Sequence, residues 1–172
     1  MFESAQRKIF ARKAWLRFRP DTWGRMIEEL CRRGEGRRES GAFLLGPREG
    51  DGGLLTVTRV VYLDDLDPTC LVGSIHFHGG AYGKLWDICE EAGLKVLGDI
   101  HTHPGERVGQ SAIDRENPML ARHGHVALIA PGFATGTVRS GDVGVHRYQG
   151  EDGWSSHFGS EARRLLYVGR FA

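Results

Sequence analysis

The chain has 172 residues, of which 40% are hydrophobic and 26% charged, a length and composition typical of one globular domain. The formal net charge of +1 argues against binding nucleic acid through overall charge, and no apolar run is long enough to span a membrane or to form a signal peptide. Three widely spaced cysteines without a CxxC pair favour a reducing compartment. We therefore expect a cytoplasmic protein that binds neither nucleic acid nor membrane.

The charge is distributed unevenly. Residues 1–38 carry eleven Lys and Arg against five Asp and Glu, a balance of +6, which leaves −5 for the remainder because the total is +1. This basic region is either a docking face for an acidic partner or a solvated surface, and we favour the solvated surface. We predict a basic lead-in over residues 1–13 and a single domain over residues 14–172.

The first half of the chain reads as strands around one helix. Alternating apolar and basic residues predict a strand over 14–19, and Pro20 then opens a helix that ends near Arg33, with its apolar side chains on one face. Apolar and β-branched runs predict three further strands, at 41–46, 54–62 and 72–77. Turn-forming and acidic residues predict loops between them, at 47–53 and 63–70.

The second half interleaves helices and strands. The pattern predicts helices over 81–91, from Ser111 to Pro118, and over 161–168. It predicts strands over 94–100, 125–130, 137–139 and 143–148, the last two as a hairpin, and a short strand at Trp154. On the helix over 81–91, the residues expected to face inward are Leu85, Trp86, Ile88 and Cys89. Interleaved elements of this kind favour an α/β fold, a layered α-β-α domain with a central mixed β-sheet.

The residues with chemical potential follow the apolar segment 94–100. His101 and His103 end this predicted strand two positions apart, so their side chains point to the same face. Ser111 and Asp114 lie three positions apart on a helical turn and also share a face. Two imidazoles and one carboxylate make a three-ligand zinc site with an open fourth position, which is typical of catalytic zinc.

A second interpretation needs no metal. Ser111 followed by Asp114 also matches a capping box, and histidines at a strand end can be ordinary polar residues. We favour the metal because two neutral imidazoles on one face of a very apolar strand are costly to bury unless they are paired. We therefore predict one Zn²⁺ per chain, bound by His101, His103 and Asp114.

A zinc hydrolase also needs a general base, which takes a proton from the attacking water and returns it to the leaving amine. Our candidate is Glu39, which immediately precedes the predicted strand over 41–46. Glu35 and Glu49 also lie near this strand, so distance along the chain does not choose among the three.

Three segments, in this order, resemble the JAMM signature of the JAB/MPN metalloprotease family: Glu39-Ser40-Gly41, His101-Thr102-His103-Pro104 and Ser111-Ala112-Ile113-Asp114. The resemblance covers about residues 14–150 and implies a JAB/MPN, cytidine-deaminase-like fold. It implies that the two histidines and Asp114 bind zinc and that Glu39 is the general acid/base. It also implies that Ser111 helps to stabilise the tetrahedral intermediate.

Members of this family cleave the isopeptide or peptide bond after the C-terminus of a ubiquitin-like protein, and inactive members that lack ligands act as scaffolds. The resemblance thus implies a deubiquitinase-like zinc isopeptidase whose partner is a ubiquitin-like protein or its conjugate. The small size resembles bacterial members that are encoded beside E1-like and E2-like proteins in antiviral conjugation systems. Two alternatives stay open: a peptidase that processes a sulfur-carrier protein, and a non-catalytic MPN-type interaction module.

Other chemically interesting residues have simpler interpretations. His76 and His78 share a face but lack a nearby third ligand, so we expect them to line a groove or end a strand rather than bind a second metal. His123 and His125 also alternate, and we interpret them as structural or as supporting the metal site. Cys89 is expected in the core, because no base or orienting group accompanies it as a nucleophile would require.

Overall fold

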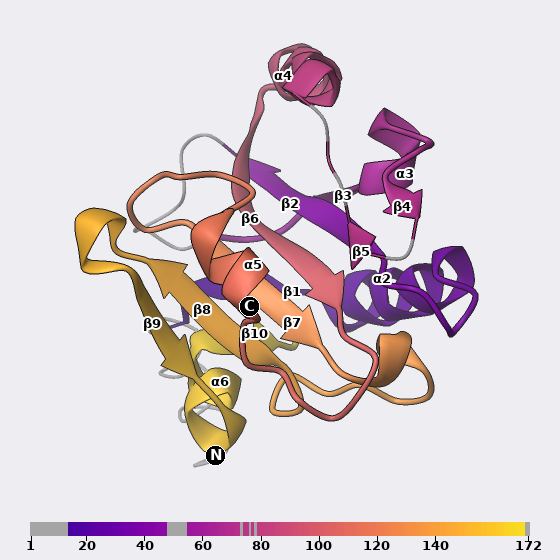
Figure 1. Cartoon of the computed structure of the whole chain (residues 1–172). Helices are drawn as coiled ribbons and strands as arrows, with labels where there is room; N and C mark the ends of the chain where they lie inside the picture. Colours follow the sequence, from indigo (N-terminus) through magenta and orange to yellow (C-terminus); the bar gives the residue numbers. More distant parts are fainter. Residues whose placement is uncertain (1–13, 48–54, 73, 76, 78, 171–172) are drawn as a thin grey trace.

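A six-stranded mixed sheet forms the centre of the protein, with the strands in the order β3-β2-β6-β7-β8-β9 (Figure 1). The computed structural model describes residues 14–47, 55–72, 74–75, 77 and 79–170. The strands of this sheet are β2 (Gly41–Pro47), β3 (Arg59–Tyr62), β6 (Leu94–Thr102), β7 (Val126–Ala130), β8 (Gly144–Tyr148) and β9 (Trp154–His157). Strands β6 and β7 run parallel, and the other neighbouring strands run antiparallel.

One face of the sheet packs against two helices and a small second sheet. These elements are α2 (Pro20–Arg33), α6 (Gly159–Leu165) and the parallel pair β1 (Leu16–Phe18) and β10 (Leu166–Val168). Helix α2 forms because Pro20 pre-sets its first turn and its apolar side chains recur on one face. Its buried residues are Trp23, Met26, Ile27 and Leu30, the face predicted from the sequence. The indole Nε1–H of Trp23 donates to the carbonyl of Val138 at 2.8 Å and ties the helix to the chain before β8.

The opposite face packs against α4 (Gly79–Ala92), α3 (Leu63–Leu66) and the short hairpin of β4 (Leu71–Val72) and β5 (Ser74–Ile75). The alternation along β2 separates the two cores, because Ala42 and Leu44 belong to the first and Phe43 and Leu45 to the second. The short helix α5 (Ala112–Glu116) lies over the sheet in front of β7 and β8 (Figure 1). The predicted α/β architecture with a central mixed sheet and flanking helices is therefore confirmed.

Several predicted element boundaries are wrong. The predicted loop over 63–70 contains α3, and the predicted strand over 72–77 is instead part of the β4–β5 hairpin. Residues 137–139 form no strand, since β8 pairs with β9 instead. The predicted terminal helix ends at Leu165, and the chain continues as β10. The 3₁₀ turns η2 (Gly132–Ala134) and η3 (Gly150–Asp152) join β7 to β8 and β8 to β9.

Helix α4 differs from its predicted orientation at one residue. Leu85 and Cys89 are buried as expected, but Trp86 is 47% exposed. The inward stripe repeats every four residues from Ala81, so Trp86, one position after Leu85, falls at the side of the helix. Its ring stacks on Tyr82, with ring centroids 6.4 Å apart. The indole is therefore half covered by the helix itself rather than by the core.

The predicted lead-in over residues 1–13 lies outside the described residues, as do His76, His78 and most of the predicted loop over 47–53. Within the part of the chain that the structure describes, no helix is both long enough and apolar enough to cross a membrane.

Candidate metal centre

Strand β6 delivers the two predicted histidine ligands to one place. His101 lies between Gly41 of β2 and Ile129 of β7 in the sheet register, so neighbours on both sides fix its backbone. His103 follows the end of β6, yet its amide still donates to the carbonyl of Ala130 at 2.9 Å. The two imidazoles therefore stay on the same face, with their Nε2 atoms 3.1 Å apart.

Asp114 approaches the histidines from α5. Its Oδ1 lies 3.5 Å from Nε2 of His101, and its Oδ2 lies 3.4 Å from Nε2 of His103. The carboxylate is also half of a capping box, because Oδ2 accepts the amide of Ser111 at 2.6 Å while the Ser111 hydroxyl accepts the amide of Asp114 at 3.2 Å. The two interpretations of the Ser-x-x-Asp sequence are thus compatible: the cap aims the carboxylate at the histidines.

The electrostatics of the three groups favour a charged carboxylate. Burial disfavours the ionised form of Asp114, but hydrogen bonds to His101 and His103 outweigh it and hold the pKa of this carboxyl well below its usual range. The hydrogen bond with Asp114 likewise raises the pKa of His103 above its usual value, against the effect of burial. The Asp114 carboxylate is therefore ready to neutralise a cation placed among these three side chains.

The three donors fit a zinc ion. One ligand atom from each of His101, His103 and Asp114 can be chosen so that all lie within 4.8 Å of one another. Zinc–nitrogen and zinc–oxygen bonds near 2.0–2.1 Å in a tetrahedron place neighbouring donors roughly 3.3 Å apart. The two Nε2 atoms lie 3.1 Å apart, and each has one oxygen of the Asp114 carboxylate nearby: Oδ1 lies 3.5 Å from His101 and Oδ2 lies 3.4 Å from His103. A mixed nitrogen and oxygen set with three protein ligands leaves a fourth position for water or substrate.

Glu39 lies beside this cluster, at the segment that leads into β2. Its neighbour Ser40 is fixed against β6, because the Ser40 carbonyl accepts the amide of Thr102 at 2.9 Å and the Ser40 amide donates to Oγ1 of Thr102 at 3.0 Å. Partial burial raises the pKa of Glu39, while the charges of His101 and His103 lower it by less. The carboxylate is thus within electrostatic reach of the ligands without being one of them.

The two other glutamates considered from the sequence have different positions. Glu35 is exposed and forms ion pairs with Arg37 and Arg38. Glu49 lies outside the described residues. Of the two described glutamates, Glu39 is therefore the one whose charge interacts with those of the cluster.

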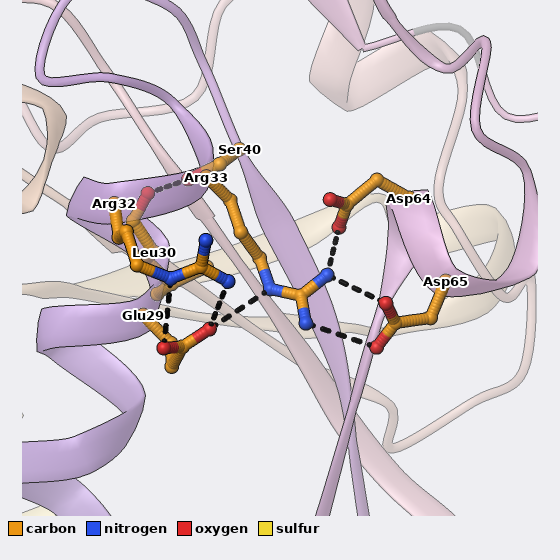
Figure 2. Close-up of polar contacts among 7 residues, drawn as sticks. All are labelled: Glu29, Leu30, Arg32, Arg33, Ser40, Asp64 and Asp65. Atoms are coloured by element: carbon orange, nitrogen blue, oxygen red, sulfur yellow. Dashed lines mark hydrogen bonds and ion pairs between the residues drawn. The ribbon is translucent and has the colours of Figure 1, made fainter.

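Polar contacts at the end of α2 hold this helix against α3 and against Ser40, the residue after Glu39 (Figure 2). Arg33 Nη1 lies 2.7 Å from carboxylate oxygens of both Asp64 and Asp65, which joins α2 to α3. Burial opposes the charge of Arg33, but its hydrogen bonds to the two aspartates raise its pKa. One turn earlier, the carbonyl of Leu30 accepts the hydroxyl of Ser40 at 2.7 Å. Ser40 is thus held between α2 and β6.

The structure also contains a histidine–aspartate pair, His125 and Asp99, that was not predicted from the sequence. His125 was expected to be structural or to support the metal site. It is fully buried, with Nε2 2.5 Å from Oδ1 of Asp99, a residue of β6 that the sequence did not single out. His123, by contrast, is exposed. Sequence reasoning also missed His146, a buried residue of β8, because its partners lie in a loop distant along the chain.

The comparisons with known proteins identify the fold but leave the activity open. No family model matches the sequence. The solution structure of protein DSY2949 from Desulfitobacterium hafniense is similar over 91% of this chain and 94% of that chain, with 19% identity and a TM-score of 0.60. AF2198 from Archaeoglobus fulgidus, a JAB1/MPN domain protein, matches 79% of this chain and 91% of its own, with 15% identity and a TM-score of 0.45. The likeness to DSY2949 is one of fold alone, and the score for AF2198 is too low to support a conclusion.

Proposed function

We propose that this protein is a zinc-dependent isopeptidase or peptidase that cleaves after the C-terminus of a ubiquitin-like protein. The observation that carries the proposal is the convergence of His101, His103 and Asp114 with spacing that suits zinc, beside the half-buried carboxylate of Glu39. A bound Zn²⁺ would polarise the scissile carbonyl and acidify the attacking water. Side chains of the protein would carry out the proton transfers and stabilise the tetrahedral intermediate.

Glu39 is proposed as the general base and acid. A carboxylate takes a proton from the attacking water most effectively when its pKa lies closer to the working pH, and burial raises the pKa of Glu39 in that direction. The same group, once protonated, donates to the leaving amine. The next residue, Ser40, is hydrogen-bonded to both β6 and α2, and these bonds fix the backbone that carries the Glu39 carboxylate.

Ser111 is proposed to donate a hydrogen bond to the tetrahedral intermediate. Its hydroxyl oxygen accepts the amide of Asp114, which uses one lone pair and leaves the O–H proton free for another acceptor. Ser111 is exposed, so substrate can reach it. The cap and the catalytic role are therefore compatible in one side chain.

The substrate class comes from the resemblance to JAMM proteases rather than from a pocket. We propose a ubiquitin-like protein or its conjugate as partner, with E1-like and E2-like proteins of a bacterial antiphage conjugation system as further partners, and a cytoplasmic location. Processing of a sulfur-carrier protein is the alternative reaction. The intact ligand set disfavours the non-catalytic module, since a scaffold has no need of three converging ligands.

Metal analysis combined with a cleavage assay tests the proposal. The full chain, purified without chelators, should contain one zinc per chain and release a ubiquitin-like protein from a C-terminal fusion. Protein without zinc would contradict the proposal. A zinc-loaded protein that cleaves no ubiquitin-like or sulfur-carrier fusion, and whose binding to such a protein is unaffected by Glu39→Gln, would support the interaction module instead.

A further inference from the structure

The loop between β6 and α5 is held by two histidines through consecutive carbonyl groups. His103 Nδ1 lies 3.2 Å from the carbonyl oxygen of Arg107. His146 Nε2 lies 2.9 Å from the carbonyl oxygen of Val108. A carbonyl can only accept, so each of these ring nitrogens carries the proton. One histidine belongs to the metal centre and the other to β8.

His146 is buried and has both ring nitrogens engaged. Its exposed fraction is 0%, and its Nδ1 lies 2.8 Å from the hydroxyl oxygen of Ser156 on β9. Because Nε2 donates to Val108, Nδ1 has the lone pair that accepts the Ser156 hydroxyl proton. Burial lowers the pKa of His146, so the ring is held neutral in this one tautomer.

The loop also packs closely against β8. A Cβ built on Gly144 would lie 2.0 Å from the carbonyl oxygen of Val108, so a side chain at that position would displace the loop. Phe158 packs edge-on against His146, with ring centroids 5.6 Å apart, and its ring edge lies 4.0 Å from a Cβ built on Gly109. The Arg107–Gly109 backbone therefore has its place set by β8 and the residues after β9.

The position of this loop affects the orientation of the His103 ring, because the ring is hydrogen-bonded to the Arg107 carbonyl. With the Nδ1 proton directed to Arg107, the ring nitrogen available to a metal is Nε2, the atom that faces His101 and Asp114. Outer hydrogen bonds of this kind fix the tautomer and ring orientation of metal-binding histidines. A loop that moved away from β8 would carry the Arg107 carbonyl with it and release the ring.

We propose that His146 is a positioning residue for the metal centre: its hydrogen bond to Val108 holds the loop so that the Arg107 carbonyl orients His103 for metal binding. The inference rests on the proposed zinc site and deepens it. The hydrogen-bond partners of His146 are Val108 and Ser156 rather than a ligand. Its role is to connect β8 to a ligand that lies at the end of β6.

The test is the zinc affinity of His146→Phe, measured by competition with a chromophoric chelator. Phenylalanine fills the space but donates nothing to Val108, and we expect zinc to bind about 10–100-fold more weakly, the usual cost of losing an outer-shell partner. His146→Gln, whose amide can donate again, should recover part of the affinity. Val145→Ala is the matched control, because Val145 is the neighbour of His146 on β8 and packs in the core that contains α2. It should lower thermal stability and leave zinc affinity within about threefold.

Zinc affinity of His146→Phe within threefold of wild type would overturn the inference, as would an equal loss in Val145→Ala. Should His146→Phe fail to fold, long-range ¹H–¹⁵N spectra of the zinc-loaded wild-type protein decide the matter. They should show His146 protonated on Nε2 and His103 protonated on Nδ1, and the opposite tautomer at either ring refutes the proposal. If the wild type itself takes up no zinc, the proposed function fails first, and that failure is visible before any variant is made.

Discussion

Strand β6 contributes to two histidine–aspartate clusters that behave in opposite ways. At Asp99 the partner is His125, the atoms are 2.5 Å apart and the imidazole is fully buried. Two residues further along, His101 meets Asp114 at 3.5 Å, with the Asp114 side chain 21% exposed. The first cluster is closed, because its two buried side chains contact each other directly rather than through an ion. The second keeps its donors at the separation that a zinc ion needs and leaves a side open.

The difference follows from where each carboxylate comes from. Asp99 and His125 sit on or beside adjacent parallel strands, so the sheet brings them into direct contact. Asp114 comes from α5, and the capping box with Ser111 aims its carboxylate at the histidines, with oxygens 3.5 Å from His101 and 3.4 Å from His103. The same residue types therefore give a structural pair in one case and, in the other, a group that could hold a metal ion. The predictions below separate these roles.

The largest effect should come from removing a ligand of the open cluster. His101→Ala or Asp114→Ala should weaken zinc binding by more than about 100-fold, because losing a ligand costs more than losing an outer-shell partner. Metal content after dialysis, together with chelator competition, measures the loss. The exposed His123 gives the control, since His123→Ala should keep full zinc content. A stoichiometric zinc in both ligand variants would place the metal elsewhere.

Removal of the proposed base should separate metal binding from catalysis. Glu39→Gln keeps the size of the side chain but cannot take a proton, so cleavage should fall about 100- to 10,000-fold while zinc content stays at one per chain. Steady-state rates on a ubiquitin-like fusion measure the change. Glu35→Gln, at the exposed ion-paired position, should cleave as the wild type does. Full activity in Glu39→Gln would exclude Glu39 as the base.

The closed cluster should affect stability instead. His125→Phe leaves Asp99 buried without its partner, and the free energy of unfolding should fall by about 3 kcal/mol, as for other broken buried pairs. Urea denaturation of the apo protein gives the value. Loss of the exposed imidazole in His123→Ala should change it by less than about 0.5 kcal/mol. If both variants are equally stable, the 2.5 Å contact contributes nothing to the fold.

A smaller loss of stability should follow from opening the Arg33 network, which is closed like the Asp99 pair but lies nearer the surface. Arg33→Met removes the link to Asp64 and Asp65, and about 1–2 kcal/mol of unfolding free energy should be lost because the Arg33 side chain is only 14% exposed. Arg25→Met is the matched variant, since Arg25 is 73% exposed and pairs within its own helix. Its effect should stay below about 0.5 kcal/mol. Equal losses in the two variants would contradict the assigned role of Arg33.

The smallest effect is a displacement of the pH profile. Burial raises the pKa of Glu39, a bound zinc ion would lower it, and the base must be ionised to act, so kcat/KM should show an acidic limb whose position depends on both effects. Activity then rises with pH through that limb. Glu39→Asp, which retains a carboxylate but moves it, should keep an acidic limb at a lower overall rate. A profile that is flat through the acidic range would argue against a carboxylate base.

The convergence of the three candidate ligands could be predicted because their relation is local. His101, His103 and Asp114 lie within fourteen residues, and the strand period and the helical turn fix which side chains share a face. The role of Glu39 was harder to predict, because the pairing of β2 with β6 is what brings this residue to the cluster. Two other glutamates, Glu35 and Glu49, also lie near β2 in the sequence. The choice came from the resemblance to JAMM proteins.

The remaining features depend on contacts that no local pattern encodes. His146 reaches Val108 across 38 positions of the chain, and the pairing of β6 with β7 and of β7 with β8 brings them together. The segment after Leu165 looks helical by itself, yet it forms β10 because β1 offers a strand edge. Trp86 was misplaced because the inward face of α4 is narrower than its apolar composition implies.

The pairing of β1 with β10 has a consequence for how the chain acquires its structure. Leu16 and Leu166 are partners although 150 positions separate them. A contact that closes so large a loop forms only after the chain between has been compacted. During synthesis on the ribosome, residues 16–18 therefore emerge well before their partner, because the 149 residues between Leu16 and Leu166 must be translated first. Until then, the edge of β1 that pairs with β10 has no strand beside it.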